Sequence, residues 1–359
     1  MPGLPLQGEE LVNRILLGLA IVSGFTAFIS SGTGALAADR TLAERAGGVI
    51  GTLPEVAESS TNPATEARVA LGRQLYFDTR LSKNQDISCN SCHRLDAFGV
   101  DGEATSPGHR GQRGDRNSPT VYNAALHDTQ FWDGRAADVE EQASGPVTNP
   151  IEMAMPDAPA VDRVLRSIPG YASEFAAAFP EDSEPVVFSN AAIAIAAFER
   201  TLLTPAPIDA FIAGDDSALD PEQQRGLELF LTVGCTTCHN GAAVGGMMFQ
   251  KLGLVHSYET EDGGRFRVTG QEQDRGYFKV PGLRNVAKTG PWFHDGSVAT
   301  LGDAVQKMAW YQLGRKLTDA ETADLVAFLG ALTGAPSAEM IAVPDLPASG
   351  PETPAPDPS

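Results

Sequence analysis

Apolar positions recur at helical spacing in several separate segments of the chain. This periodicity predicts helices over residues 67–77, 189–203, 221–234, 300–312 and 319–332. Asp220 and Pro221 are typical of a helix N-cap and of a first helical turn, so they predict where the third of these helices begins. No strand-like run competes with these segments. The pattern therefore predicts a mainly α fold with long irregular loops.

The N-terminal segment has the pattern of an export signal. Residues 15–30 form an apolar run, Arg14 precedes it, and a stretch of mostly small residues follows, ending Ala35-Leu36-Ala37. We expect residues 1–38 to be a cleaved signal peptide, with an uncleaved N-terminal anchor as the alternative. The run is short for a full membrane span.

Composition adds limits on size and partners. A chain of 359 residues is long enough for two domains with cores of their own. The formal net charge of −20 argues against nucleic acid as a partner and suits a basic or dipolar protein partner. Residues 336–359 are rich in Pro, Ala, Asp and Ser and lack periodicity, so we expect a disordered Pro-rich tail.

All four cysteines belong to two copies of one motif, Cys-x-x-Cys-His. The copies are Cys89-Asn-Ser-Cys92-His93 and Cys235-Thr-Thr-Cys238-His239. In this motif two thiols bond a haem and the adjacent histidine ligates its iron. A zinc site, a redox dithiol or two disulfides would not require the trailing histidine. The sequence therefore predicts two covalently bound haem c groups. It also predicts export, because bacteria attach such haems outside the cytoplasm.

Beyond the two haem motifs, the two halves of the chain align at a constant offset of 162 residues. Five positions are identical in this register: Pro119, Asn123, Phe131, Asp133 and Gly134 correspond to Pro281, Asn285, Phe293, Asp295 and Gly296. We therefore expect two cytochrome c-like domains, at 39–205 and 206–335, each built around one haem.

Met308 is the candidate second iron ligand of the second haem. Leu301, Ala304, Val305 and Met308 share one face of a predicted helix. At the same offset Met308 corresponds to Pro146, which has no side-chain donor. The pattern indicates a high-potential His239/Met308 haem for electron transfer and a low-potential His93 haem for substrate. Core packing of Met308, or ligation by the Met247–Met248 pair, are the alternatives.

Longer runs resemble a known family. CNSCHRLDAFGVDG, GHRGQRG, SPTVYNAALHDTQFWDGR, KVPGLRNVAKTGPWFHDGSV and AVQKMAWYQLG are similar to bacterial di-haem cytochrome c peroxidases. The likeness covers about residues 62–333. The related enzyme MauG has a tyrosine where this chain has Met308, which favours the peroxidase.

The resemblance implies roles for several residues. His109 in the GHRG loop looks like a removable sixth ligand of the first haem, and an exposed loop histidine is the alternative. Trp132 resembles the aromatic residue between the haems, although plain packing is equally compatible. Glu152 resembles the distal carboxylate, with a surface glutamate as the alternative, and Gln142 a neighbouring pocket residue. His294 aligns with Trp132 and is expected near the second haem, without an assigned role.

The resemblance also implies a structural calcium ion between the domains. Asn117 matches one calcium ligand, and Thr289 and Pro291 match two that act through main-chain oxygens. Oxygen ligands suit a hard cation. His127 and His256 are assigned no role beyond surface or packing.

The activity implied by the resemblance is that of a cytochrome-c peroxidase. Hydrogen peroxide would be reduced with electrons from a reduced cytochrome c or a small copper protein (cupredoxin). We expect a periplasmic homodimer. A MauG-like oxidase of a partner protein and a non-enzymatic di-haem electron carrier are the alternative functions.

Overall fold

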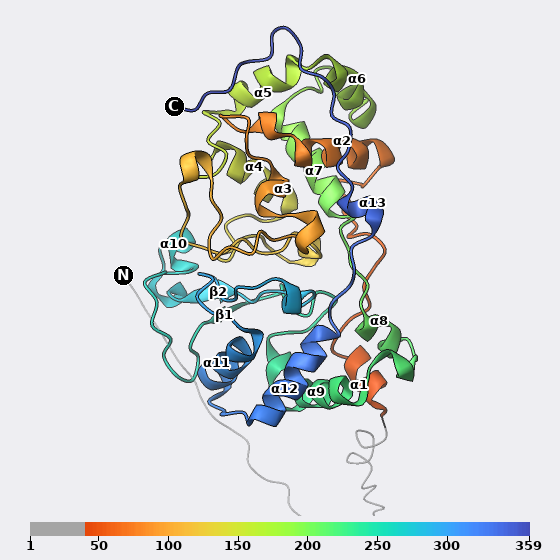
Figure 1. Cartoon of the computed structure of the whole chain (residues 1–359), viewed down its shortest axis with the longest axis vertical. Helices are drawn as coiled ribbons and strands as arrows, with labels where there is room; N and C mark the ends of the chain where they lie inside the picture. The colour runs from red at the N-terminus through yellow and green to blue at the C-terminus, as the bar shows by residue number, and fades with distance from the viewer. Residues whose placement is uncertain (1–39) are drawn as a thin grey trace, which may run out of the picture. The chain divides into compact units, whose positions relative to one another are not determined.

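The computed structural model describes residues 40–359, so the expected signal or anchor lies outside the described residues (Figure 1). The helices are α1 (Leu42–Gly47), α2 (Glu66–Phe77), α3 (Cys89–Cys92), α4 (Val139–Thr148), α5 (Ala158–Arg166), α6 (Pro169–Ala178), α7 (Phe188–Glu199), α8 (Pro207–Ile212), α9 (Pro221–Thr232), α10 (Phe266–Thr269), α11 (Leu301–Leu313), α12 (Asp319–Gly330) and α13 (Ala338–Ile341). Two short strands, β1 (Phe249–Lys251) and β2 (Tyr277–Lys279), pair antiparallel. The mainly α prediction is confirmed. None of the helices within residues 40–359 has the length and apolar character that crossing a membrane requires.

The first core is formed by α2 and by α4 to α7. Helix α2 packs on α7, and α7 also contacts α4. Leu71 and Leu75 of α2 are fully buried there. A side chain at Gly72 would place its Cβ 1.8 Å from the main-chain oxygen of Ala194 in α7. Glycine therefore sets the close approach of these two helices.

The second core repeats this arrangement with α9 and α12. Asp220 caps α9 as predicted, because its carboxylate accepts hydrogen bonds from the main-chain nitrogens of Glu222 and Gln223. A Cβ at Gly226 would lie 1.8 Å from the main-chain oxygen of Asp324 in α12. The two domains thus use one kind of helix crossing, each with a glycine at the contact.

The N-terminal helix belongs to the second core. Ala46 of α1 and Ile50 are fully buried among residues of α8, α9 and α12. Arg45 donates a hydrogen bond of 2.9 Å to Glu228 in α9. The packing of α1 on the second core departs from the expected domain boundary, because residues 39–205 were expected to form the first domain. The apolar face of α1 is buried against the second domain, although the chain then continues into the first.

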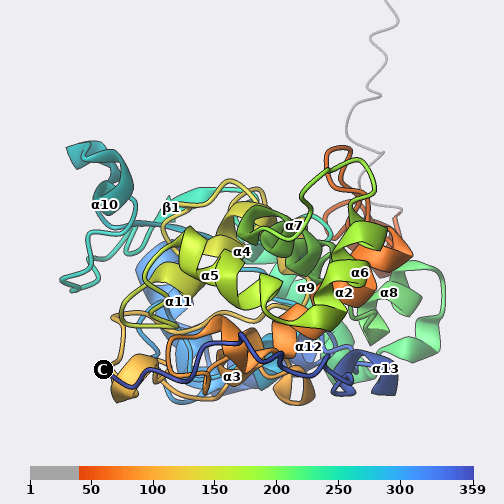
Figure 2. The same ribbon diagram turned by 90° about the horizontal axis from the view of Figure 1, so that it is seen from above.

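The C-terminal residues make the opposite crossing. Residues 337–359 leave the second domain after α12 and lie along the first domain, where both views show them beside it (Figures 1 and 2). They were expected to form a disordered tail. Instead, main-chain oxygens such as that of Pro347 accept hydrogen bonds from side chains of the first domain, here Arg80 at 2.8 Å. Proline lacks the N–H donor but keeps this acceptor.

Candidate active site

The first Cys-x-x-Cys-His motif borders a cavity in the first domain. Cys89 and Cys92 begin and end α3, and both line this cavity together with His93. Nδ1 of His93 lies 2.9 Å from the main-chain oxygen of Pro119. Burial lowers the pKa of His93. A neutral imidazole whose Nδ1 is held by a carbonyl presents Nε2 as a metal ligand.

The second motif borders a cavity in the second domain. Cys235, Cys238 and His239 line it. Burial lowers the pKa of His239 to about 4. Nδ1 of His239 is buried and has no hydrogen-bond partner among residues 40–359. His239, like His93, is therefore neutral at pH 7. Ligation of a metal requires this neutral form.

The donor sets of both cavities fit a c-type haem. None of the four cysteines forms a disulfide. Burial raises the pKa of Cys92 and of Cys235 to about 11, so both remain thiols at neutral pH. In each cavity a pair of thiols lies beside a neutral histidine, which is the donor set that covalent haem attachment requires.

The two cavities differ at the position that the duplication relates. Met308 of α11 lines the second cavity, and so do Leu301, Ala304 and Val305, the residues predicted to share its helical face. Pro146 in α4 lines the first cavity. Met247 is about half exposed, with 48% of its surface accessible, and is not among the residues that line the second cavity in the described part. Met308 thus lines the same cavity as His239, and Pro146 the same cavity as His93.

Glu152 and Gln142 both line the first cavity. Burial raises the pKa of Glu152, while the charge of Arg135 and a hydrogen bond from Asn149 partly oppose the rise. That hydrogen bond runs from Nδ2 of Asn149 to Oε1 of Glu152 at 2.9 Å. A carboxyl group with a raised pKa in a cavity is suited to taking up and releasing protons.

His109 is hydrogen-bonded through its main chain to Glu152, but it is not among the described residues that line the first cavity. Its main-chain nitrogen donates to the oxygen of Glu152 at 2.7 Å. Its side chain is buried, and Nε2 lies 3.2 Å from the main-chain oxygen of Ser359. Of the described residues around this loop, Gly108 lines the cavity and His109 does not.

Trp132 lies between the two cavities and lines both. Its Nε1 donates to the main-chain oxygen of Asn117 at 2.9 Å. The ring of His294 stands edge-on to it, with 6.5 Å between ring centroids. Trp132 is therefore an aromatic side chain that both cavities share.

The three candidate calcium ligands gather at the second cavity. Asn117, Thr289 and Pro291 all line it. The side-chain amide of Asn117 donates from Nδ2 to the main-chain oxygens of Glu103 and Ala104, at 2.9 and 3.2 Å, which fixes the orientation of the amide. Within residues 40–359 there is no cluster of three or more His, Cys, Asp or Glu side chains suited to a metal. The candidate calcium ligands are the side-chain amide of Asn117 and two main-chain oxygens, so such a cluster would not include them.

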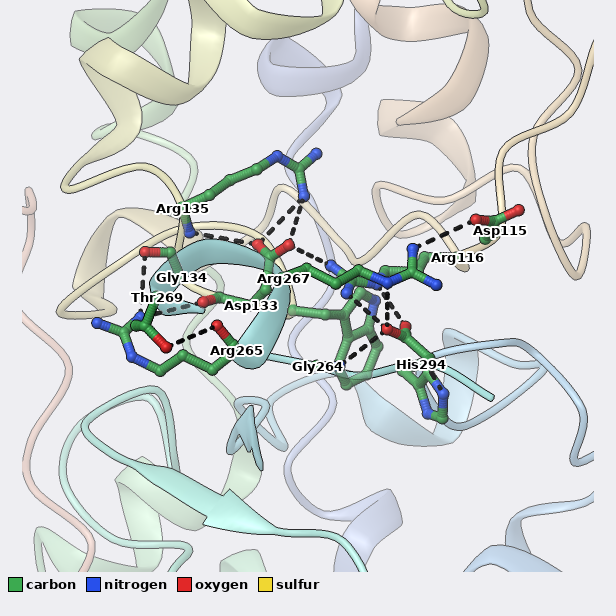
Figure 3. Close-up of polar contacts among 12 residues, drawn as sticks. Asp115, Arg116, Asp133, Gly134, Arg135, Gly264, Arg265, Arg267, Thr269 and His294 are labelled. Carbon is green, nitrogen blue, oxygen red and sulfur yellow. Dashed lines mark hydrogen bonds and ion pairs between the residues drawn. The ribbon is translucent and has the colours of Figure 1, made fainter. Parts of the chain in front are cut away.

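Charged side chains join the loops of the two domains (Figure 3). Arg116 of the first domain contacts Asp133 at 2.5 Å and Asp262 of the second domain at 2.7 Å. Arg267 reaches Asp262 as well, at 3.1 Å. Burial alone would raise the pKa of Asp262, but the hydrogen bond from Arg116 and further interactions lower it to about 2. Nε2 of His294 lies 3.9 Å from this carboxylate.

Sequence reasoning missed a buried pair at the second cavity. Nζ of Lys279 lies 3.1 Å from Nδ1 of His127 and donates to the oxygen of Thr129 at 2.9 Å. Burial lowers the pKa of Lys279 to about 7. His127, assigned no role from sequence, lines this cavity, whereas His256 stacks on Trp310 at a centroid distance of 3.8 Å. Arg135 beside Glu152 was missed too, although it ends the run FWDGR.

Comparisons with known proteins show the family to which the chain belongs. A family model for di-haem cytochrome c peroxidase matches residues 66–217, and one for cytochrome c matches residues 223–333. The cytochrome c551 peroxidase of Pseudomonas aeruginosa is 44% identical, over 89% of this chain and 94% of that protein. The cytochrome c551 peroxidase of Nitrosomonas europaea is 45% identical, over 82% and 88%.

More distant relatives include MauG. The methylamine utilization protein MauG of Methylorubrum extorquens is 34% identical, over 81% of this chain and 85% of that protein. Among solved structures, a MauG-like protein associated with microbial copper homeostasis superimposes with a TM-score of 0.73 at 30% identity, over 82% of this chain and 97% of that one.

Fold and site together define a mainly α enzyme with two c-type haem domains. The chain belongs to the di-haem cytochrome c peroxidase family.

Proposed function

We propose that the protein reduces hydrogen peroxide to water with electrons from a reduced cytochrome c or a small copper protein. The reaction consumes two electrons and two protons and yields two water molecules. When bound, the two haems supply the electron transfer and the cleavage of the O–O bond. The chain holds them, admits peroxide and moves protons.

The observation that carries this proposal is the difference between the two cavities. His239 and Met308 line one cavity and would both be ligands of the second haem iron. His93 and Pro146 line the other, where proline cannot act as a ligand, which supports a position free for peroxide. A pure electron carrier would need two permanently six-coordinate irons, so this difference favours an enzyme.

Glu152 is the proposed proton-transfer group. It takes a proton from one peroxide oxygen and returns it to the other, which lets water leave. Its place in the first cavity and its raised pKa support this role, and Gln142 is a neighbour in the same cavity. A positioned acid/base group of this kind contributes roughly 10²–10⁴-fold in rate.

His109 and the calcium site are proposed to control access and coupling. His109 would be a removable ligand of the first haem, and its loop would control access to that haem. Asn117, Thr289 and Pro291 hold calcium between the domains. We further propose a homodimer in the periplasm.

The direct test is a peroxide assay with reduced cytochrome c, before and after half-reduction of the protein. Consumption of reductant with peroxide, increased by half-reduction, supports the peroxidase. A MauG-like oxidase would instead oxidise a partner protein and tolerate loss of Met308. An electron carrier would show no peroxide-dependent oxidation of the donor.

A further inference from the structure

The tail segment, residues 337–359, connects the second domain to the loop of His109. It begins just after α12 and lies along the outside of the first domain (Figures 1 and 2). Met340 in α13 packs against the first core. The tail is therefore attached to one domain by the chain and to the other by contacts.

Side chains of the first domain bind the tail along its length. Arg80 donates to the oxygen of Pro347 at 2.8 Å, Ser167 to the hydroxyl of Thr353 at 3.1 Å, and Gln85 to the oxygen of Pro354 at 2.7 Å. Two glycines allow close contact, because a Cβ at Gly170 would lie 2.5 Å from Pro347 and one at Gly350 would lie 2.2 Å from the oxygen of Ser167. These contacts fix the path of the tail.

Lys83 joins the end of this path to the active-site loop. Its Nζ donates to the main-chain oxygen of Ser359 at 2.7 Å and lies 3.6 Å from the carboxylate of Asp357. Its main-chain oxygen accepts from the nitrogen of Asp357 at 2.9 Å, and its main-chain nitrogen donates to Met153, the residue after Glu152, at 2.9 Å. One residue thus contacts both the tail and the Glu152 segment.

The same Ser359 oxygen lies 3.2 Å from Nε2 of His109. A ring nitrogen that shares a hydrogen with an oxygen cannot at the same time donate its lone pair to a metal. Binding of His109 to the tail and ligation through this nitrogen therefore exclude each other.

We propose that the tail segment positions His109 away from the first haem, with Lys83 and Ser359 as the positioning residues. The tail competes with the iron for His109 and favours the form that is open to peroxide. This inference rests on the proposed role of His109 as a removable ligand. Beyond that role, we infer that in the open form the imidazole of His109 binds the tail segment, which extends from the second domain.

The effect should be moderate. A hydrogen bond supported by an ammonium group changes an equilibrium by roughly tenfold. The affinity of a probe that binds only the open form falls in proportion to the open fraction. Cyanide, which binds open ferric haem, is such a probe.

Two variants of the holoprotein test the inference. One ends at Pro344 and so keeps α13 but lacks the tail beyond it, and the other is Lys83→Met. We expect roughly tenfold weaker cyanide binding at the first haem and a more low-spin spectrum of the oxidised protein in both. Lys83→Arg should restore both readouts, and Lys251→Met, an exposed lysine of the second domain, should change neither. Haem content and circular dichroism check folding.

The same truncation in a His109→Gly background completes the test. There the tail has no histidine to bind, so truncation should leave cyanide affinity unchanged. If truncation weakens binding in that background too, the tail acts through the fold and the inference is overturned. If His109→Gly opens the first haem but neither tail variant changes cyanide binding or the spectrum, the inference about the tail is wrong. The proposed role of His109 as a removable ligand would then still stand. If His109→Gly leaves the oxidised spectrum low-spin, the proposed removable ligand fails and the inference with it.

Discussion

At the scale of single residues, Met308 and Pro146 carry the difference between the two cavities. They occupy the same position in the duplicated sequence, and each lines the cavity of its own domain. A thioether ligand favours ferrous iron and raises the potential of a haem. Proline offers no such ligand, so the two haems should differ in potential and in reactivity.

Replacing Met308 with leucine should lower the potential of the second haem. Axial ligands move haem potentials over about 0.8 V, so we expect a fall on the order of 0.1 V or more. Two haems should remain bound, because their thioether bonds do not depend on Met308. A spectroscopic redox titration measures the change, with Met247→Leu, at a half-exposed methionine, as the control. An unchanged titration would show that another residue is the ligand.

Glu152→Gln should lower the turnover of peroxide while leaving its binding site intact. The amide has a similar size but cannot exchange a proton, so kcat should fall by roughly 10²–10⁴-fold. Because burial raises the pKa of Glu152, activity of the parent protein should fall as pH drops through that raised pKa, and the variant should lose this acidic limb. Steady-state assays across pH test this, with the exposed Glu184→Gln as control. Normal turnover of Glu152→Gln would direct attention to Gln142 and ordered water.

The residues found from sequence are those whose role follows from local spacing. The Cys-x-x-Cys-His motifs and the helical face of Met308 are short-range patterns, and the structure brings the members of each together at one cavity. Lys279 and Arg135 escaped notice because a lone Lys or Arg carries no spacing signal. Their significance arises only when folding buries one beside His127 and places the other near Glu152.

At the scale of elements, the crossing of α9 and α12 depends on the absence of a side chain at Gly226. A Cβ there would meet the main-chain oxygen of Asp324 at 1.8 Å, and a main-chain atom cannot move aside without shifting the helix. The matching crossing of α2 and α7 has the same requirement at Gly72. Helix pairs in both domains are thus set by backbone proximity.

Gly226→Ala should therefore destabilise the second domain. Forcing an extra carbon into a packed contact costs about 1–3 kcal/mol. Gly330→Ala is the matched control, because it lies in α12 with nothing within 4 Å of an added Cβ. That change should be neutral or stabilising by up to about 1 kcal/mol, since alanine favours helix. Urea unfolding of the holoprotein measures both, and equal stability of the two variants would contradict the crossing argument.

Helix positions were predictable where periodicity and caps agree, as at Asp220, which caps α9 as expected. The domain against which α1 packs, and the one against which the tail packs, were not predictable. Ala46 and Ile50 belong to a short apolar segment whose sequence does not indicate a packing partner. Only their long-range contacts place them in the second core. The tail lacks periodicity because it is held by main-chain oxygens, which are the same for every residue type and leave no pattern in the sequence.

At the scale of the whole described chain, residues 41–359 form one compact unit in which two haem domains are joined by polar contacts. Arg116 bridges Asp133 and Asp262 across the domains. The main-chain nitrogen of Asn117 donates to the oxygen of His294 at 2.7 Å, and Trp132 donates to Asn117. A change at the second cavity therefore has a short path of direct contacts to the first.

Removing calcium should interrupt this coupling without removing either haem. The proposed ligands Asn117, Thr289 and Pro291 line the second cavity, and Asn117 also borders the first, where it supports Trp132. Coupling between sites is typically 1–3 kcal/mol, so activation after half-reduction should fall by about 5- to 150-fold after treatment with a strong chelator. Added calcium should restore it and magnesium should not, because magnesium demands a smaller and stricter octahedral site. Asn117→Ala should reproduce the chelated state. If the ion is stripped and peroxidase activity is unchanged, the assignment of these three ligands is wrong.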